Sequence, residues 1–445
     1  MLDQVGTTLA ATVTAAQVTL VCPLCGSTTS GDTTRFRCAC GTPFDLPADA
    51  FPLEAADAET WRVRFQQRLA AFQGGSAADK SGVWRYRELL LPLPEDQIVT
   101  RQEGNTPLYA VGAAEASGWR RVGAFAGLET LYLKHEGQNP TGSFKDRGMT
   151  AGMSVARSLG ARAVACASTG NTSASLAAYA AQAGLPALVF LPTGKVAGGK
   201  LAQSYAYGAR TVEVPGDFDD AMRQVEQVAD ELGIYLLNSI NPYRVAGQRA
   251  IGYELLQQLD WQAPEWVVLP AGNLGNTSAI GAALLHAARL GLIDRVPRIG
   301  AIQAAGANAF ARSYASGWRE FAPVTAHTRA SAINIGAPVS YARARAVIEA
   351  TGGVVTEVSD EEIFAAKAQI DRAGIGCEPA SAASVAGARR LVAEGVIAPD
   401  ARVVAILTGH VLKDTEQATG PIDGDEQPSP ELDALLRNIR RVLPG

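Results

Sequence analysis

Short apolar runs alternate with longer amphipathic stretches along the chain from residue 103 onward. The amphipathic stretches have the period of helices, and the apolar runs have the length of buried strands. Strands are expected at residues 131–135, 161–167, 186–191, 210–214, 234–237, 265–270, 298–303, 353–358 and 401–407. This alternation predicts βαβ units on parallel sheets. Ligand-binding loops are therefore expected at the carboxyl ends of the strands.

The pattern differs towards both ends of the chain. Residues 58–73 predict a helix, because large apolar side chains recur on one face: Trp61, Phe65, Leu69 and Phe72. Residues 73–82 are rich in Gly, Ser and Ala and predict a loop. The apolar and aromatic residues 83–90 predict an arm that docks on the main body. A short amphipathic pattern at residues 431–443 predicts a last helix.

Together these patterns predict an α/β protein with parallel sheets, and 445 residues are enough for two or three domains. The segments outside the alternating region are a cysteine-containing ribbon (20–46), a helical arm with its linker (51–93) and a polar tail with the last helix (416–445).

Composition and charge narrow the class of protein. Hydrophobic residues make up 47% of the chain and charged residues 19%, which is typical of a globular protein. A net charge of −5 gives no support for a nucleic-acid or anionic-membrane partner. No apolar run approaches the ~20 residues of a membrane span. Residues 1–20 lack the basic and densely apolar parts of a secretory signal, so a cytoplasmic protein is expected.

Four of the six cysteines lie close together, in two turns that are each followed by glycine: Cys22, Cys25, Cys38 and Cys40. Two such turns can bring four sulfurs to one zinc ion, and a site filled in this way is structural. Clustered cysteines in a long chain that looks intracellular favour metal over disulfides. The second pair is tighter than usual, with one residue between the thiols, so two disulfides or two reduced thiol turns remain alternatives.

The stretch 134–149, KHEGQNPTGSFKDRGM, carries the strongest candidate for chemistry. Its Asn, Pro and Gly residues predict a turn after an apolar strand. Ser143 and Asp146 have the spacing of a capping box, which predicts a helix that starts at Ser143. Lys145 would then lie in the first turn, where unpaired N–H groups favour a neutral amine. Such an amine suits a Schiff base with a carbonyl compound, although many lysines at helix starts are simply solvated.

Two further strand-to-helix turns are rich in small residues. They are Ser168-Thr169-Gly170-Asn171 and, after the strand at 265–270, Gly272-Asn273-Leu274-Gly275-Asn276. Small residues allow backbone N–H groups to approach a ligand, and a helix start favours an anion. The second loop lacks the spacing of nucleotide-binding motifs, which favours a compact monophosphate. Ordinary strand-to-helix turns are the alternative for both loops.

A third segment, Asn238-Ser239-Ile240-Asn241-Pro242-Tyr243-Arg244, has amides, a hydroxyl and a guanidinium group. These groups can bind a carboxylate or a phosphate. The alternative is a capped helix start with a surface arginine.

Residues 134–149 closely resemble the pyridoxal-phosphate lysine motif of threonine synthases, which belong to the tryptophan-synthase-β-like fold group. Other stretches match in order: 103–108 (EGNTPL), 168–171, 272–276, 333–336 (INIG), 378–381 (EPAS) and 407–410 (LTGH). The four-cysteine ribbon and the arm around Trp84 also look like those of some threonine synthases. The resemblance covers residues 20–415.

The resemblance implies a fold type II pyridoxal-phosphate enzyme with a small zinc-ribbon-like segment at its N-terminus. Two parallel-sheet α/β domains are then expected, a larger one that combines residues 94–144 with 259–415 and a smaller one that holds 145–258, with the cofactor in the cleft between them. The resemblance also implies that Lys145 forms the Schiff base, that Phe144 contacts the cofactor, that Asn171 hydrogen-bonds its ring hydroxyl, and that Thr408 meets the ring nitrogen. The cofactor phosphate would be held by Gly272, Asn273, Leu274, Gly275 and Asn276. The substrate phosphate or carboxylate would be bound by Ser168, Thr169, Asn238, Ser239 and Arg244.

The reaction implied is the conversion of O-phospho-L-homoserine and water to L-threonine and phosphate, the last step of threonine biosynthesis. The fold group also implies a homodimer. A threonine or serine dehydratase, or another lyase or synthase acting on a phosphorylated amino acid, is the alternative within the same chemistry. A zinc-ribbon binding protein without activity is a third hypothesis, disfavoured because Lys145, Asn171 and Thr408 are all present.

Overall fold

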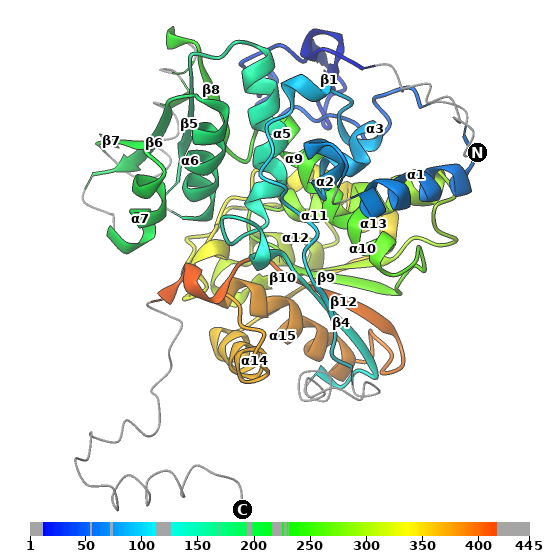
Figure 1. The fold of residues 1–445 in the computed structure, drawn as a ribbon. Coiled ribbons are helices and arrows are strands. Elements are labelled where there is room, and N and C mark those ends of the chain that lie inside the picture. Colours follow the sequence, from blue (N-terminus) through cyan, green and yellow to red (C-terminus); the bar gives the residue numbers. More distant parts are fainter. Residues whose placement is uncertain are drawn as a thin grey trace, which may run out of the picture.

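The computed structural model describes residues 12–53, 56–71, 74–112, 126–168, 170–193, 198–215, 225–226, 229 and 231–415. Within them lie two sheets flanked by helices and a small two-stranded ribbon (Figure 1). No helix in this part of the chain is long and apolar enough to cross a membrane.

The larger sheet has six strands in the order β11-β10-β9-β12-β4-β3. All neighbours are parallel except β3, which runs antiparallel to β4 at the edge. The strands are β3 (Leu108–Ala110), β4 (Thr130–His135), β9 (Trp266–Pro270), β10 (Arg298–Ala304), β11 (Val354–Val358) and β12 (Arg402–Leu407).

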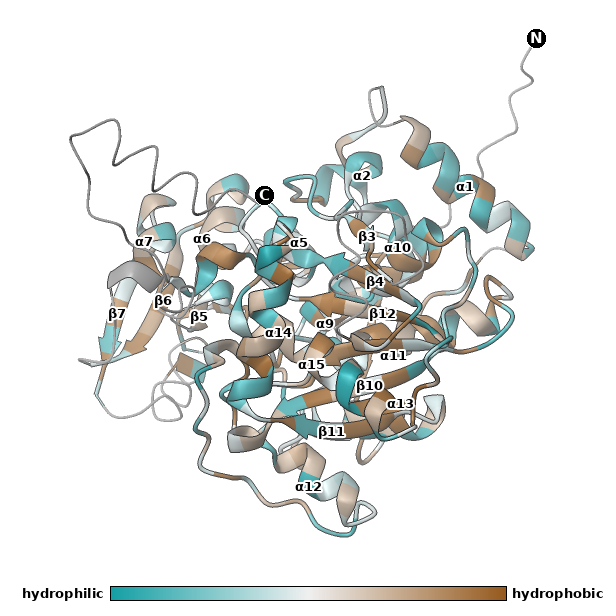
Figure 2. Ribbon diagram, turned by 90° about the horizontal axis from the view of Figure 1, so that it is seen from below, coloured by the Kyte–Doolittle hydropathy of each residue, from teal (hydrophilic) through white to brown (hydrophobic). Residues whose placement is uncertain are grey.

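Helices cover both faces of this sheet. Val267 and Leu269 of β9 belong to one core cluster with α10, α11 and α13, whereas Trp266 and Val268 belong to a second with α14 and α15. Successive strand residues face opposite sides, so a strand buried on both faces is apolar throughout. Figure 2 shows this contrast: the strands of the sheet are mainly hydrophobic and α1 is mainly hydrophilic. The helices are α10 (Ala250–Gln258), α11 (Gly275–Arg289), α12 (Ala309–Ala315), α13 (Tyr341–Thr351), α14 (Asp360–Arg372) and α15 (Pro379–Ala393).

The smaller sheet is fully parallel, in the order β7-β6-β5-β8. Its strands are β5 (Ala163–Ala167), β6 (Ala187–Pro192), β7 (Arg210–Val214) and β8 (Ile234–Leu236). The helices associated with it are α5 (Lys145–Ser158), α6 (Asn171–Ala183), α7 (Gly198–Ala206) and α9 (Pro242–Gln248). In Figure 1, α5 stands between this sheet and the rest of the molecule. The domain limits expected from the sequence stay a prediction.

The ribbon is an antiparallel pair, β1 (Thr19–Val21) and β2 (Thr28–Ser30), that packs against α9. The Tyr243 hydroxyl of α9 donates to the Gly31 carbonyl at 2.6 Å. Phe36 meets Tyr235 edge-on with 5.4 Å between ring centroids. The ribbon thus contacts the residue that directly precedes Arg244.

All nine strands expected from the apolar runs are present. The helix expected at 58–73 is confirmed as α1 (Ala58–Ala70), with Trp61 and Phe65 buried, whereas Phe72 lies outside the described residues. The expected loop at 73–82 holds a short helix, α2 (Ala77–Lys80). It forms because Ser76 caps it by accepting from Asp79 N–H.

The arm is confirmed as a docked segment, because Trp84 and Tyr86 are fully buried. It consists of η3 (Trp84–Tyr86) and α3 (Arg87–Leu90). The tail 416–445 and its expected helix lie outside the described residues. The other short 3₁₀ turns are η1 (Ala15–Gln17), η4 (Glu95–Gln97), η5 (Glu136–Gln138), η6 (Ala305–Ala307), η7 (Ser331–Ile333) and η8 (Val411–Lys413).

Candidate active site

Lys145 lies where α5 meets the end of β12. The Phe144 N–H donates to the Thr408 carbonyl at 3.0 Å, and Ser143 forms an isolated antiparallel bridge with Gly409. Two segments that are far apart in sequence are therefore joined directly beside the lysine. The Lys145 amine stands over the Phe144 ring, 4.1 Å from its centroid.

The capping box expected at Ser143 and Asp146 is wrong. Helix α5 begins at Lys145, and its N-cap residue Phe144 makes no side-chain cap. The Asp146 carboxylate instead accepts from the Thr141 backbone at 2.7 Å, the Thr141 hydroxyl at 2.5 Å and the Ser175 hydroxyl at 2.6 Å. A fully buried carboxylate needs several donors, and the preceding turn and α6 supply them.

The Lys145 pKa is lowered to about 7. Burial is the largest cause, the nearby Arg244 guanidinium adds to it, and Glu378 opposes both. The sequence predicted a lowered Lys145 pKa from the helix start alone. It did not predict the effect of Arg244, which comes from a distant segment. A neutral amine at this position is a nucleophile at physiological pH.

This pKa predicts how fast the protein without cofactor captures pyridoxal phosphate. The fraction of neutral Lys145 rises about tenfold per pH unit below its pKa and levels off above it. We expect the capture rate to rise up to pH 7 and then flatten, as measured by the growth of visible absorbance after stopped-flow mixing. A rate that keeps rising towards pH 10 would contradict the lowered pKa.

Asn171, Glu378 and Thr408 meet close to this lysine. Asn171 is the first residue of α6, and its side-chain amide donates to the Glu378 carboxylate at 2.9 Å. Thr408 follows β12 and donates its hydroxyl hydrogen to the same carboxylate at 3.0 Å. The predicted cofactor contacts Asn171 and Thr408 are thus brought together by a glutamate to which the sequence assigned no role.

The glycine loop 272–276 has buried polar atoms that no described residue satisfies. Leu274 is held in the left-handed region with φ of 64°, and α11 begins at Gly275. Both polar atoms of the Asn276 amide and the hydroxyl of Thr277 are buried without a hydrogen-bond partner among the described residues. Unsatisfied donors at a helix start fit a phosphate group, which a monophosphate cofactor supplies.

Arg244 is a second buried group with an unsatisfied donor. Asn241 caps α9 by accepting from the backbone of Tyr243 and Arg244, and Pro242 occupies the first turn. The Arg244 side chain is 1% exposed, so the alternative of a surface arginine is wrong. One nitrogen donates to the Leu237 carbonyl at 2.7 Å, and Nε has no partner among the described residues. Burial lowers the Arg244 pKa to about 10, and its surroundings favour a bound anion.

The other residues predicted to bind substrate have different positions. The Asn238 amide makes two hydrogen bonds to the backbone of Ala167, both of 3.1 Å, and so braces the end of β5. The Ser239 hydroxyl accepts from Asn273 of the glycine loop at 2.9 Å. Ser168 follows β5 and is partly exposed. Thr169 lies outside the described residues.

A buried charge cluster holds the elements around this site together. The Glu254 carboxylate of α10 accepts from Lys134 of β4 at 2.5 Å and from Arg147 of α5 at 2.8 Å. Arg147 also donates to Glu136 at 2.6 Å. All four side chains are at most 1% exposed. The first turn of α5 is therefore fixed to η5 and α10, and Lys134 joins β4 to the same cluster.

Replacing Glu254 with glutamine is expected to lower the free energy of unfolding by about 3 kcal/mol, because it leaves buried Lys134 and Arg147 short of one negative charge. Urea denaturation measures this change. The matched control is Glu349→Gln, which breaks an exposed pair with Arg345 and should cost less than about 1 kcal/mol. Equal losses in the two variants would contradict the structural role of the cluster.

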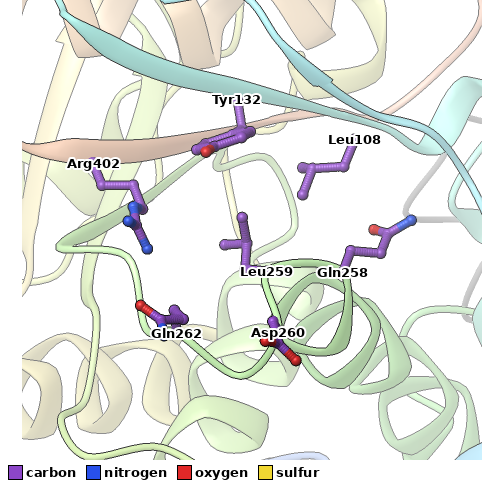
Figure 3. A pocket seen from close by; sticks show the side chains of 7 residues that line it. All are labelled: Leu108, Tyr132, Gln258, Leu259, Asp260, Gln262 and Arg402. Atoms are coloured by element: carbon purple, nitrogen blue, oxygen red, sulfur yellow. The ribbon is translucent and has the colours of Figure 1, made fainter. Parts of the chain in front are cut away.

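A separate cavity has a volume of about 580 Å³, and Figure 3 shows the side chains that line it. Its lining residues are Leu108, Tyr132, Gln258, Leu259, Asp260, Gln262 and Arg402. Arg402 is the first residue of β12, whereas Thr408 follows the last. None of the predicted site residues lines this cavity, and ligands of parallel sheets bind at the carboxyl ends of strands. We therefore place the candidate active site at Lys145.

Comparisons with known proteins show which family the chain resembles. Residues 99–409 match the family model described as "Pyridoxal-phosphate dependent enzyme". A threonine synthase from Methanocaldococcus jannaschii is 42% identical over 424 residues, which span 95% of this chain and 98% of that protein. One from Methanosarcina acetivorans is 48% identical over 365 residues, or 82% of this chain and 87% of that protein.

The chain belongs to the threonine synthase family. It is a pyridoxal-phosphate-dependent lyase of fold type II.

Solved structures of other pyridoxal-phosphate enzymes share the fold of this threonine synthase family member. Maize serine racemase superposes with a TM-score of 0.58 at 20% identity, covering 87% of this chain and 98% of the racemase chain. A threonine deaminase from Solanum lycopersicum superposes with a TM-score of 0.60 at 20% identity, covering 82% of this chain and 95% of the deaminase chain. At this identity the likeness concerns the fold alone.

The residues present fit the cofactor of the threonine synthase family. The partly buried amine of Lys145 suits its aldehyde, and the unsatisfied Asn276 and Thr277 groups suit its phosphate. Thr277 and Gln248, whose Oε1 is also unsatisfied, were missed by the sequence reasoning. Thr277 directly follows the predicted loop and could have been included. Gln248 lies at the end of α9, and no sequence signal marks it.

Proposed function

We propose that this protein converts O-phospho-L-homoserine and water to L-threonine and phosphate. The observation that carries the choice of a phosphorylated substrate is Arg244, a buried guanidinium group with no acidic partner among the described residues. It lies close enough to Lys145 to lower that residue's pKa. A substrate phosphate between them supplies the missing negative charge.

When bound, pyridoxal phosphate withdraws electrons from the substrate's reacting carbons. The protein supplies the remaining functions. The neutral Lys145 amine binds the cofactor and, once displaced by substrate, removes and returns protons at the substrate carbons. Backbone N–H groups of residues 272–276 hold the cofactor phosphate, while Phe144, Asn171 and Thr408 contact its ring. Arg244 stabilises the departing substrate phosphate, helped by Ser168, Thr169, Asn238 and Ser239.

The direct test incubates the purified protein, loaded with cofactor, with O-phospho-L-homoserine. Equal amounts of phosphate and L-threonine are expected, measured by a colorimetric phosphate assay and by amino-acid chromatography. A parallel incubation with L-threonine tests dehydration, which forms a 2-oxo acid. Oxo-acid formation from threonine without phosphate release from phosphohomoserine would favour the dehydratase.

We also infer that the cysteine ribbon binds one structural zinc ion. The four cysteine sulfurs all lie within 4.8 Å of one another, and the two pairs Cys22–Cys40 and Cys25–Cys38 are each 3.5 Å apart. Sulfurs at the corners of a zinc tetrahedron are about 3.8 Å apart, given Zn–S bonds of about 2.3 Å. The ribbon packs against α9, so the metal would support the helix that carries Arg244.

Metal analysis is expected to find one zinc per chain, and less than about a tenth of that in Cys22→Ser and Cys38→Ser, since structural zinc needs its full ligand set. Inductively coupled plasma mass spectrometry on the purified protein measures this. The matched control is Cys166→Ala, a buried cysteine in β5 outside the ribbon, which should keep its zinc. A wild-type protein free of zinc after purification without chelators would contradict the proposal.

A cytoplasmic homodimer completes the proposal. Light scattering on the purified protein tests the assembly, and a mass of one chain would contradict it.

A further inference from the structure

Glu378 is a buried acid at the point where the proposed cofactor contacts meet. Its side chain is 3% exposed. One carboxylate oxygen accepts from the Asn171 amide at 2.9 Å, and the other accepts from the Thr408 hydroxyl at 3.0 Å. Asn171 and Thr408 are proposed to face the ring hydroxyl and the ring nitrogen of the cofactor. A single carboxyl group therefore contacts both.

The surroundings of Glu378 are shaped for a carboxyl group. A Cβ atom at position 409 would lie 2.3 Å from the Glu378 Cδ atom, so glycine is required there. Burial raises the Glu378 pKa, whereas Lys145 and Lys413 favour its charged form from α5 and η8. The buried thiol of Cys377 precedes it in the chain. Burial thus raises the pKa of Glu378 above its usual range, although the hydrogen bonds from Asn171 and Thr408 also favour the charged form.

The single hydroxyl hydrogen of Thr408 links the protonation state of Glu378 to the cofactor. When Glu378 is charged, Thr408 donates to it and has only lone pairs left, so it can accept from a ring nitrogen that carries a proton. When Glu378 is protonated, it donates to Thr408, which then donates to a bare ring nitrogen. Ser381, 3.0 Å from the Thr408 oxygen, holds the hydroxyl in place.

We infer that Glu378 is a positioning residue that acts through Thr408 and determines whether the ring nitrogen of the cofactor carries a proton. The transfer is balanced: the Glu378 proton moves to the Thr408 oxygen, and the hydrogen of Thr408 moves to the ring nitrogen. A carboxylate and a positively charged ring result, with no other reactant. The inference rests on the cofactor contacts proposed above.

The test uses the holoenzyme loaded with pyridoxal phosphate that carries ¹⁵N in its ring. In Glu378→Gln, the amide accepts from Asn171 and donates to Thr408, as a protonated Glu378 would. We expect the ring-nitrogen NMR signal of the wild type to shift with pH, and that of Glu378→Gln to keep its unprotonated position throughout. Identical ring signals in the two proteins overturn the inference.

The matched control is Glu357→Gln in β11, where Glu357 also accepts from an asparagine amide, that of Asn308 at 2.8 Å. It should behave as the wild type. If circular dichroism shows that Glu378→Gln does not fold, Thr408→Val and Thr408→Ser replace it: the valine variant should lose the pH response and the serine variant keep it. A valine variant that keeps the response overturns the inference. A wild type that binds no cofactor overturns the proposed contacts as well.

Discussion

Replacing Lys145 with alanine is expected to reduce threonine formation at least about 1000-fold, since the variant loses both the covalent attachment of the cofactor and the main proton carrier. The visible absorbance of the attached cofactor should disappear at the same time. Stability should change little or rise slightly, because the amine is held in a site that disfavours its charge. Threonine and phosphate assays, a visible spectrum and thermal unfolding measure the three effects.

The matched control for this variant is Lys80→Ala, which removes a lysine from the end of the short helix α2. It should keep the wild-type spectrum and rate. Wild-type turnover by Lys145→Ala would exclude the assignment of Lys145, even if the protein still bound pyridoxal phosphate.

Replacing Arg244 with leucine should change activity and stability in opposite directions. We expect kcat/KM for phosphohomoserine to fall about 100-fold or more, because a charge pair with the substrate phosphate is lost. The free energy of unfolding of the unliganded protein should rise by about 1 kcal/mol, because an uncompensated buried charge is removed. Steady-state kinetics and urea denaturation measure the two quantities.

Two observations separate this role from a general disturbance of the site. The cofactor absorbance of Arg244→Leu should match that of the wild type. Arg244→Lys keeps the charge but loses the bidentate geometry of the guanidinium group. Its kcat/KM should therefore lie between those of the wild type and Arg244→Leu. An unchanged kcat/KM in Arg244→Leu would remove the argument for a phosphorylated substrate.

The central parallel strands could be predicted because they are buried on both faces. A run such as Trp266–Pro270 is apolar at every position, which separates it clearly from its amphipathic neighbours. The edge strand β3 was missed, because Leu108–Ala110 is short and only partly buried. The ribbon strands β1 and β2 were missed for a similar reason: they have three residues each, and β2 is entirely polar.

The chemistry of the site was only partly visible in the sequence. Lys145 and the glycine loop follow strands directly, so local pattern marks them. The lowered Lys145 pKa, however, results mainly from burial and partly from Arg244, which lies 99 positions further along the chain. The capping box failed because Asp146 found better donors in Thr141 and Ser175. Contacts between distant segments are set by tertiary packing, so they cannot be predicted from the spacing of residues in the sequence.

The hydrogen bond from Phe144 to Thr408 has a consequence for motion in the molecule. Lys145 and Thr408 belong to one hydrogen-bonded strip, so a rotation of the smaller sheet cannot change the distance between them much. Asn171 and Arg244 lie outside that strip, on helices α6 and α9. Opening and closing would therefore move Arg244, the proposed phosphate-binding residue, relative to Lys145 and Thr408, whose spacing stays nearly constant.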